Sequence, residues 1–227
     1  MAVPTVVSVT DRSFVSGSWS FTFDATGVDC IVLFFRLYND SGPTAAAFDG
    51  NAFTKVFNDA ATAHISGSET REIWVCAVPS GSRGSHTLTV TEAGIVFLTT
   101  MGVSGVDQTT VYSATANSED VYPGGAATLS FPLTTTGTDS LLVGFLSEQT
   151  PGTTTGQSGT TRYAADSSQS VLTATAASAG SNNLSFISSS GAEYVMCTRL
   201  ELLAAAGGGG GSVHSPVMRL LHTQGNL

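Results

Sequence analysis

Three glutamates are the best-placed residues of this chain for acid–base chemistry. Glu72, Glu193 and Glu201 lie inside apolar, strand-like segments. A glycoside hydrolase needs two carboxyl groups that face each other across a cleft, and such a pair would have to come from these three residues. Most other acidic residues border glycines or chain reversals, where aspartate accepts hydrogen bonds from backbone N–H groups. They are Asp24, Asp29, Asp40, Asp49, Asp59, Asp120 and Asp139.

Other catalytic and metal-binding patterns are missing from the sequence. The four histidines, His64, His86, His214 and His222, are far apart, and none has a cysteine nearby, so their spacing does not predict a metal site. The segments GVSGV and GSRGS do not have the Gly-x-Ser-x-Gly spacing of a serine hydrolase. The loops NDSG and SEDVYPGG lack the dense acidic repeat of a calcium site. We therefore expect no enzymatic activity, no metal and no cofactor.

Aromatic side chains are the candidates for recognition of a sugar. Trp19 and Trp74 have apolar neighbours and are expected in the core. Tyr122 and Tyr163 lie beside glycine-rich loops and are better placed for surface recognition than Tyr38, Tyr112 and Tyr194.

The elements that would carry these residues read as short β-strands. Apolar and polar residues alternate in SWSFTFDA, which predicts a half-buried strand with Trp19, Phe21 and Phe23 on one face. The run DCIVLFFRL is apolar throughout and predicts a strand covered on both faces. Asp49-Gly50 between two apolar segments predicts a two-residue hairpin. We expect an all-β fold, an antiparallel β-sandwich of jelly-roll type, over residues 1–203.

The domain organisation follows from composition. A long apolar, strand-like run ends near residues 105–108, but no linker-like composition occurs there, so one domain is expected over residues 1–203. Residues 204–212, AAAGGGGGS, predict a flexible linker. Residues 213–227 then form a tail with enough apolar surface to dock but too little to fold alone. Its predicted docking residues are Val213, Val217, Met218, Arg219, Leu220 and Leu221.

Charge and cysteine content exclude several classes of protein. The formal net charge is -9, and the basic residues are dispersed, which argues against binding to nucleic acid. The N-terminus lacks the features of a secretory signal, and no apolar run is long enough to span a membrane, so synthesis in a cytoplasm is expected. The three cysteines, Cys30, Cys76 and Cys197, lie in apolar strand-like runs and are expected to be buried free thiols.

The succession of HTLTVT, VFLTTMGVSGV and GVDQTT at 105–110, followed by a Pro-Gly turn and a Ser/Thr-rich half, resembles jelly-roll structural proteins of tailed bacteriophages. The resemblance covers residues 5–203 in style. It implies a capsid decoration, head fibre or tail-associated protein located in the virion.

Three functional hypotheses follow. The first is a non-enzymatic virion protein, a homo-oligomer and most simply a trimer, whose tail attaches it to a capsid or tail protein. The second is a carbohydrate-binding β-sandwich that recognises a host surface glycan. The third is a polysaccharide-cleaving enzyme, which would need facing carboxylates in a groove.

Overall fold

The architecture is known for most of the chain that precedes the glycine linker. The structure, a computed structural model, describes residues 3–14, 17–38, 42–59, 69–91, 95–121, 127–148, 154–156, 160–164, 169–188 and 194–206. Within these ranges the chain forms antiparallel β-strands and one short 3-10 helix, η1 (Ser80–Ser82), and contains no α-helix. The predicted all-β class is confirmed.

The first half of the chain forms two sheets that pack face to face. The larger sheet has the strand order β1-β9-β3-β7-β6, and the smaller sheet has the order β2-β8-β4-β5. The strands are β1 (Thr5–Phe14), β2 (Trp19–Asp24), β3 (Cys30–Tyr38), β4 (Ala45–Phe48), β5 (Asn51–Ala52), β6 (Thr54–Asp59), β7 (Glu69–Ala77), β8 (Ser85–Thr91) and β9 (Ile95–Ser104).

The second half repeats this arrangement. Its larger sheet has the order β10-β17-β12-β15-β14, and its smaller sheet the order β11-β16-β13. The strands are β10 (Tyr112–Val121), β11 (Ala127–Thr135), β12 (Ser140–Glu148), β13 (Thr154–Gly156), β14 (Thr160–Ala164), β15 (Gln169–Ala176), β16 (Gly180–Ser188) and β17 (Tyr194–Leu202).

The strand orders of the two halves are the same. If β4 and β5 are counted as one interrupted strand, each half contributes eight strands in chain order. The larger sheet then reads 1-8-3-6-5 in both halves, and the smaller sheet reads 2-7-4 in both. The body therefore consists of two β-sandwiches with one topology, where the sequence predicted a single sandwich over residues 1–203.

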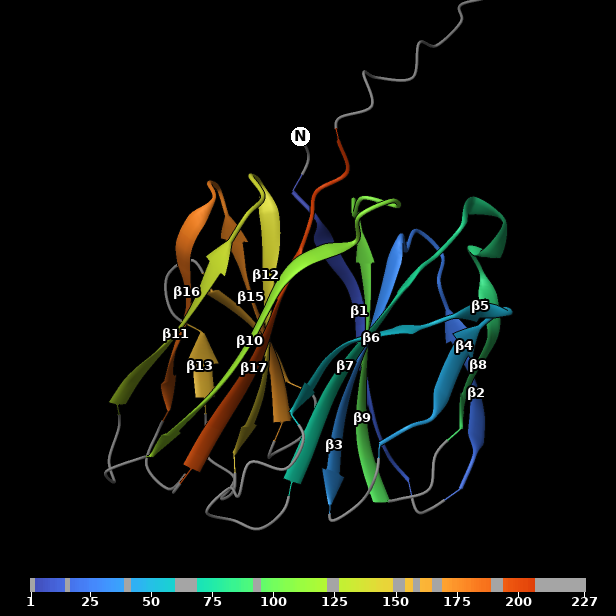
Figure 1. Cartoon of the computed structure of the whole chain (residues 1–227), viewed down its shortest axis with the longest axis horizontal. Helices are drawn as coiled ribbons and strands as arrows, with labels where there is room; N and C mark the ends of the chain where they lie inside the picture. Colours follow the sequence, from blue (N-terminus) through green and yellow to red (C-terminus); the bar gives the residue numbers. More distant parts are fainter. Residues whose placement is uncertain are drawn as a thin grey trace, which may run out of the picture.

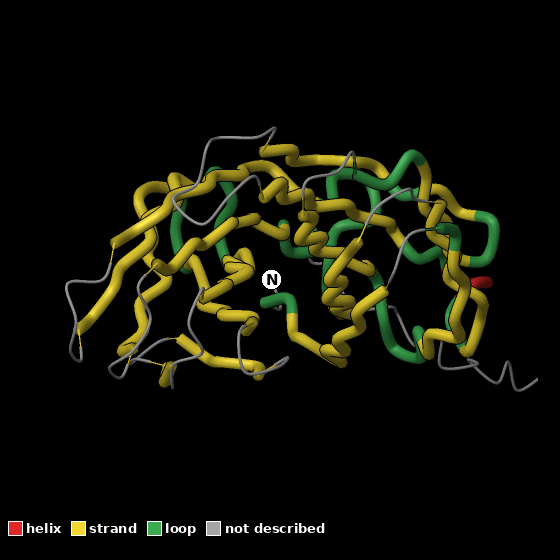
Figure 2. Tube along the Cα trace, turned by 90° about the horizontal axis from the view of Figure 1, so that it is seen from below, coloured by secondary structure: helices red, strands yellow, loops and turns green. Residues whose placement is uncertain are grey.

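The four sheets lie side by side as layers, with the two larger sheets in the middle and the two smaller sheets on the outside (Figures 1 and 2). Three apolar cores separate the layers. One lies inside the first sandwich, one inside the second, and one between the two larger sheets. This arrangement explains why the sequence showed no linker near residue 105: the two sandwiches share a core and act as one packed body.

Strand β3 lies at the centre of this arrangement and is buried on both faces. Leu33 and Phe35 point into the core of the first sandwich, whereas Val32 and Phe34 point into the core between the sandwiches. All four side chains are fully buried. The continuous apolar run predicted a strand covered on both faces, and the layers provide the reason.

Two further local predictions are confirmed. In β2, Trp19, Phe21 and Phe23 are more buried than the residues between them. Strands β4 and β5 pair as Phe48 with Asn51, and a two-residue turn with positive φ at Asp49 (48°) and Gly50 (77°) joins them. These dihedral angles are those of a type I′ turn, which matches the right-handed twist of the strands.

Candidate functional site

Glu72 is almost fully buried, and two neighbouring side chains bind its carboxylate. Lys55 Nζ lies 2.6 Å from Glu72 Oε1, and the indole N–H of Trp74 donates to Oε2 at 2.8 Å. The Lys55 ammonium also lies 4.9 Å from the centre of the Trp74 ring. Both carboxylate oxygens therefore have fixed partners, and the group neutralises the lysine at the rim of the first core.

Glu201 is completely buried and organises the turn between β11 and β12. It accepts hydrogen bonds from the hydroxyls of Ser113 and Ser140 and from the backbone N–H groups of Thr136 and Gly137, the last two at 2.9 Å each. Burial by itself raises the pKa of this carboxyl, but the four hydrogen bonds outweigh burial and hold the pKa of Glu201 below its usual value. Glu201 is thus an ionised anchor for a loop.

Glu72 and Glu201 do not face each other. Glu72 shares its face of β7 with Trp74, in the core of the first sandwich, whereas Glu201 shares its face of β17 with Cys197, in the core of the second. Both larger sheets and the core between them separate the two carboxylates. They cannot act as the acid and base of one glycosidase site. Glu193 lies outside the described residues.

The described residues contain no group of three or more His, Cys, Asp or Glu side chains that would hold a metal ion. His86 packs edge to face on Phe48, and its Nδ1 lies 3.2 Å from Asp49 Oδ1. The other three histidines lie outside the described residues.

All three cysteines are free and buried, as the sequence predicted. Burial raises the pKa of Cys76 to about 11 and that of Cys197 to about 12, and it raises the pKa of Cys30 further still. These thiols stay protonated at neutral pH and serve as small apolar groups.

The segment Gly105–Val111, which we call the connector, joins the two sandwiches. It is hydrogen-bonded to the first sandwich on one side and to the residues that follow β17 on the other. Asp29, just before β3, accepts a hydrogen bond from the Gly105 N–H at 2.5 Å and forms an ion pair with Arg83. The Gln108 side chain donates to the Asp29 carbonyl oxygen at 2.8 Å. These bonds fasten the connector to the first sandwich.

Within the connector, Asp107 caps the following turn. Its Oδ1 accepts from the backbone N–H groups of Thr109 and Thr110 at 2.7 and 2.8 Å and from the Thr109 hydroxyl at 2.7 Å. The hydrogen bond from the Thr110 N–H, with those from Thr109, lowers the pKa of Asp107 to about 2. The element GVDQTT is therefore a turn that Asp107 caps, and the role of Asp107 in it is structural.

The connector also pairs with the last described residues of the chain. The Asp107 N–H donates to the Leu203 carbonyl, the Leu203 N–H donates to the Val111 carbonyl, and the Ala205 N–H donates to the Gly105 carbonyl. The backbone of Pro4 lies next to Gly105 as well. Figure 1 shows the start of β1 and the described segment that follows β17 at the same end of the body.

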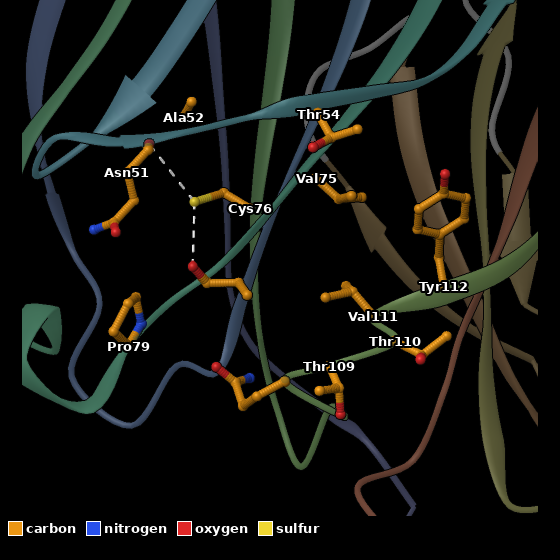
Figure 3. Close-up of a pocket in the computed structure, with 12 residues that line it drawn as sticks. Asn51, Ala52, Thr54, Val75, Cys76, Pro79, Thr109, Thr110, Val111 and Tyr112 are labelled. Atoms are coloured by element: carbon orange, nitrogen blue, oxygen red, sulfur yellow. Dashed lines mark hydrogen bonds between the residues drawn. The ribbon is translucent and has the colours of Figure 1, made fainter.

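A pocket of about 650 Å³ lies where the connector crosses the edge of the first larger sheet, and we call it the seam pocket. One wall comes from β5, β6 and β7, and the other from the connector and the start of β10 (Figure 3). Its lining residues are Asn51, Ala52, Thr54, Val75, Cys76, Ala77, Pro79, Gln108, Thr109, Thr110, Val111 and Tyr112.

The recognition residues favoured by the sequence are not brought together in the described structure. The six tail residues, from Val213 to Leu221, and Tyr122 lie outside the described residues. Tyr163 lies in β14, where its backbone pairs with Val171, and its side chain is not described. Tyr112, named in the sequence only as one of the remaining tyrosines, lines the seam pocket.

Comparison with known proteins gives no match: no family model, curated protein or solved structure is significantly similar to the chain. A search of the described residues for a helix long and apolar enough to cross a membrane finds none.

Proposed function

We propose that this protein is a non-enzymatic structural protein of a bacteriophage virion, which projects from a capsid or tail and is attached through residues 213–227. The docking residues are Val213, Val217, Met218, Arg219, Leu220 and Leu221. The partner is a capsid or tail protein, and the body assembles as a homo-oligomer, a trimer in the simplest case. The protein is made in the host cytoplasm and is located in the virion.

One observation carries this proposal: the first and the last described residues of the chain lie at one end of a firmly packed body. The backbone of Pro4 lies beside Gly105, and the Ala205 N–H donates to the Gly105 carbonyl. The last described residue, Ala206, therefore lies at the same end of the body as the start of β1. Attachment there would leave the opposite end free to project.

The strand order supports the jelly-roll part of the proposal. A jelly roll has eight strands in two facing sheets built from Greek keys. In both halves, strands 1-8-3-6 of one sheet face strands 2-7-4 of the other, which is the jelly-roll arrangement. The difference is strand 5, which here pairs with strand 6 at the edge of the larger sheet instead of with strand 4 in the smaller sheet. We propose that the body is a tandem pair of jelly rolls.

The positions of Glu72 and Glu201 support the non-enzymatic part. Each carboxylate is occupied by fixed hydrogen-bond donors, and the two lie in different cores. A polysaccharide-cleaving enzyme would need two carboxylates in one groove.

Removal of Val213–Leu227 tests the attachment. We expect the truncated protein to keep its melting temperature and to lose most of its co-sedimentation with particles. A matched control removes only Gln224–Leu227 and keeps the apolar residues 217–221; it should co-sediment normally. Normal co-sedimentation of the longer truncation would overturn attachment through the tail.

A second candidate function is recognition of a host carbohydrate. The seam pocket favours it, because the pocket joins a half-buried tyrosine, several hydroxyl and amide groups and no charged side chain. In this case the truncated protein would still bind a glycan saturably.

A further inference from the structure

We infer that the seam pocket is a binding subsite for a neutral saccharide, with Tyr112 as the platform on which a sugar ring lies. This inference rests on the carbohydrate-recognition candidate and is independent of virion attachment. It assigns recognition to a site between the two sandwiches that is lined by Tyr112, and not to Tyr122 or Tyr163.

The size of the pocket suits a small saccharide. Its volume of about 650 Å³ falls in the range of roughly 300–1,000 Å³ that is typical of small-molecule sites. In Figure 3, Thr54 and Val75 on one wall lie across from Val111 and Tyr112 on the other. A ligand between these walls would contact both sandwiches.

The lining favours an uncharged ligand. None of the lining side chains is an acid, a lysine, an arginine or a histidine, and the raised pKa of Cys76, about 11, keeps its thiol neutral. An anionic sugar would find no cation inside the pocket and would be repelled by the formal net charge of -9. A neutral sugar meets neither obstacle.

The mixture of apolar and polar groups matches the two kinds of surface on a sugar. A pyranose ring has an apolar face of C–H groups, which packs on an aromatic ring, and a rim of hydroxyls, which needs hydrogen-bond partners. Tyr112 supplies the ring, with Val75 and Val111 beside it. Among the described residues, the hydroxyls of Thr54, Thr110 and Tyr112 have no side-chain hydrogen bond, so they are available to a ligand.

The connector wall is fixed before a ligand arrives. Asp107 holds the backbone of Thr109 and Thr110, Gln108 is bound to the Asp29 carbonyl, and the Val111 carbonyl accepts from the Leu203 N–H. A wall that is already ordered adds affinity because little conformational entropy is lost on binding. The partners in these hydrogen bonds, Asp29, Asp107 and Leu203, do not line the pocket, so a ligand would not compete with them.

The first test is a glycan array probed with the full chain. The array carries neutral hexose and N-acetylhexosamine oligosaccharides together with sialylated and sulfated ones. We expect saturable binding to a subset of the neutral glycans, which is then measured by titration with the soluble neutral oligosaccharide that binds best. Binding restricted to anionic glycans would overturn the inference.

Substitutions then locate the site. Tyr112→Ala should weaken binding of that oligosaccharide at least tenfold, whereas the matched control Tyr163→Ala should leave it within twofold. Since Tyr112 also packs at the rim of the core between the sandwiches, two milder changes keep the test independent of folding. Thr54→Val and Thr110→Val each remove only a hydroxyl and should weaken binding about threefold to tenfold, whereas Thr87→Val, on the exposed face of β8, should not.

These experiments distinguish an error about the seam pocket from an error about carbohydrate recognition. Binding that is lost in Tyr163→Ala but kept in Tyr112→Ala, Thr54→Val and Thr110→Val would overturn the seam pocket and leave carbohydrate recognition standing. Absence of binding to every glycan on the array would overturn both.

Discussion

The rings of Phe34 and Phe145 stack across the centre of the molecule, with 5.1 Å between their centroids and 23° between their planes. The two residues are equivalent in the two sandwiches. Phe34 lies opposite Thr99 and Ile73 in its sheet, and Phe145 lies opposite Thr198 and Val171 at the matching places in the other sheet. The shared core is therefore built from the same face of the same strands in both halves.

Loss of either ring should destabilise the whole body. Phe34→Ala and Phe145→Ala each leave a cavity between the sandwiches, and we expect a loss of about 3–5 kcal/mol in the free energy of unfolding for each. Urea denaturation followed by tryptophan fluorescence would measure it, since Trp19 and Trp74 both lie in the first sandwich.

The double variant tests the stacking itself. We expect the two losses to be non-additive by about 0.5–1.5 kcal/mol, because either single substitution already removes the contact between the rings. Additive losses would mean that the two side chains contribute only through burial. A charged residue such as Phe34→Asp should prevent folding altogether.

Gly144 in β12 is required by close packing in the second core. A Cβ atom at this position would overlap a methyl group of Leu184 and approach the sulfur of Cys197. We expect Gly144→Ala to lower the melting temperature and to cost about 1–3 kcal/mol. Gly81→Ala is the control, since a Cβ there meets no atom within 4 Å; equal effects of both would contradict this packing.

Glu201 should make the second sandwich sensitive to acid. The pKa of its carboxyl is lower in the folded chain than in the unfolded chain, so its contribution is complete above about pH 4.3 and is lost as the pH falls through the folded value. Glu201→Gln should cost roughly 2–4 kcal/mol at pH 7, since buried donors lose a charged acceptor. The difference between this variant and the original protein should shrink as the pH falls below 4, which thermal melts at several pH values would show.

The Asp107 turn can be tested locally. With a pKa of about 2, the carboxylate should hold the amides of Thr109 and Thr110 at pH 4 and release them as the pH falls toward 2. In Asp107→Ala, hydrogen exchange at these two amides should be faster at pH 5 than in the original protein. Asp107→Asn keeps an acceptor oxygen and should exchange at an intermediate rate. Unchanged protection in Asp107→Ala would show that the turn holds without the cap.

The sequence predicted strands well because local patterns decide them. Alternation in β2, the apolar run of β3 and the Asp-Gly hairpin after β4 each depend on a few neighbouring residues. The division into two sandwiches is a long-range property. Thr-Gly-x-Asp occurs at 26–29 and 136–139, just before β3 and β12, but the positive φ falls on Gly27 in the first segment and on Asp139 in the second, so the match does not mark equivalent turns.

Candidate site residues were harder to predict from the sequence. All three glutamates fall in strand-like stretches of sequence, but only the layer order shows that Glu72 and Glu201 belong to different cores. The seam pocket joins β5–β7 to residues 108–112, which are distant in sequence. No local pattern distinguishes Tyr112 from the other tyrosines; its position depends on how the connector crosses the first sandwich.

Cryo-electron microscopy of the particles that co-sediment with this protein is the most direct test of its proposed function. The account predicts density for two adjacent sandwiches on a capsid or tail, with the end that carries Pro4, Gly105 and Ala205 facing the particle and residues 213–227 in contact with a neighbouring protein. Particles without this density, or a body attached by its opposite end, would contradict it.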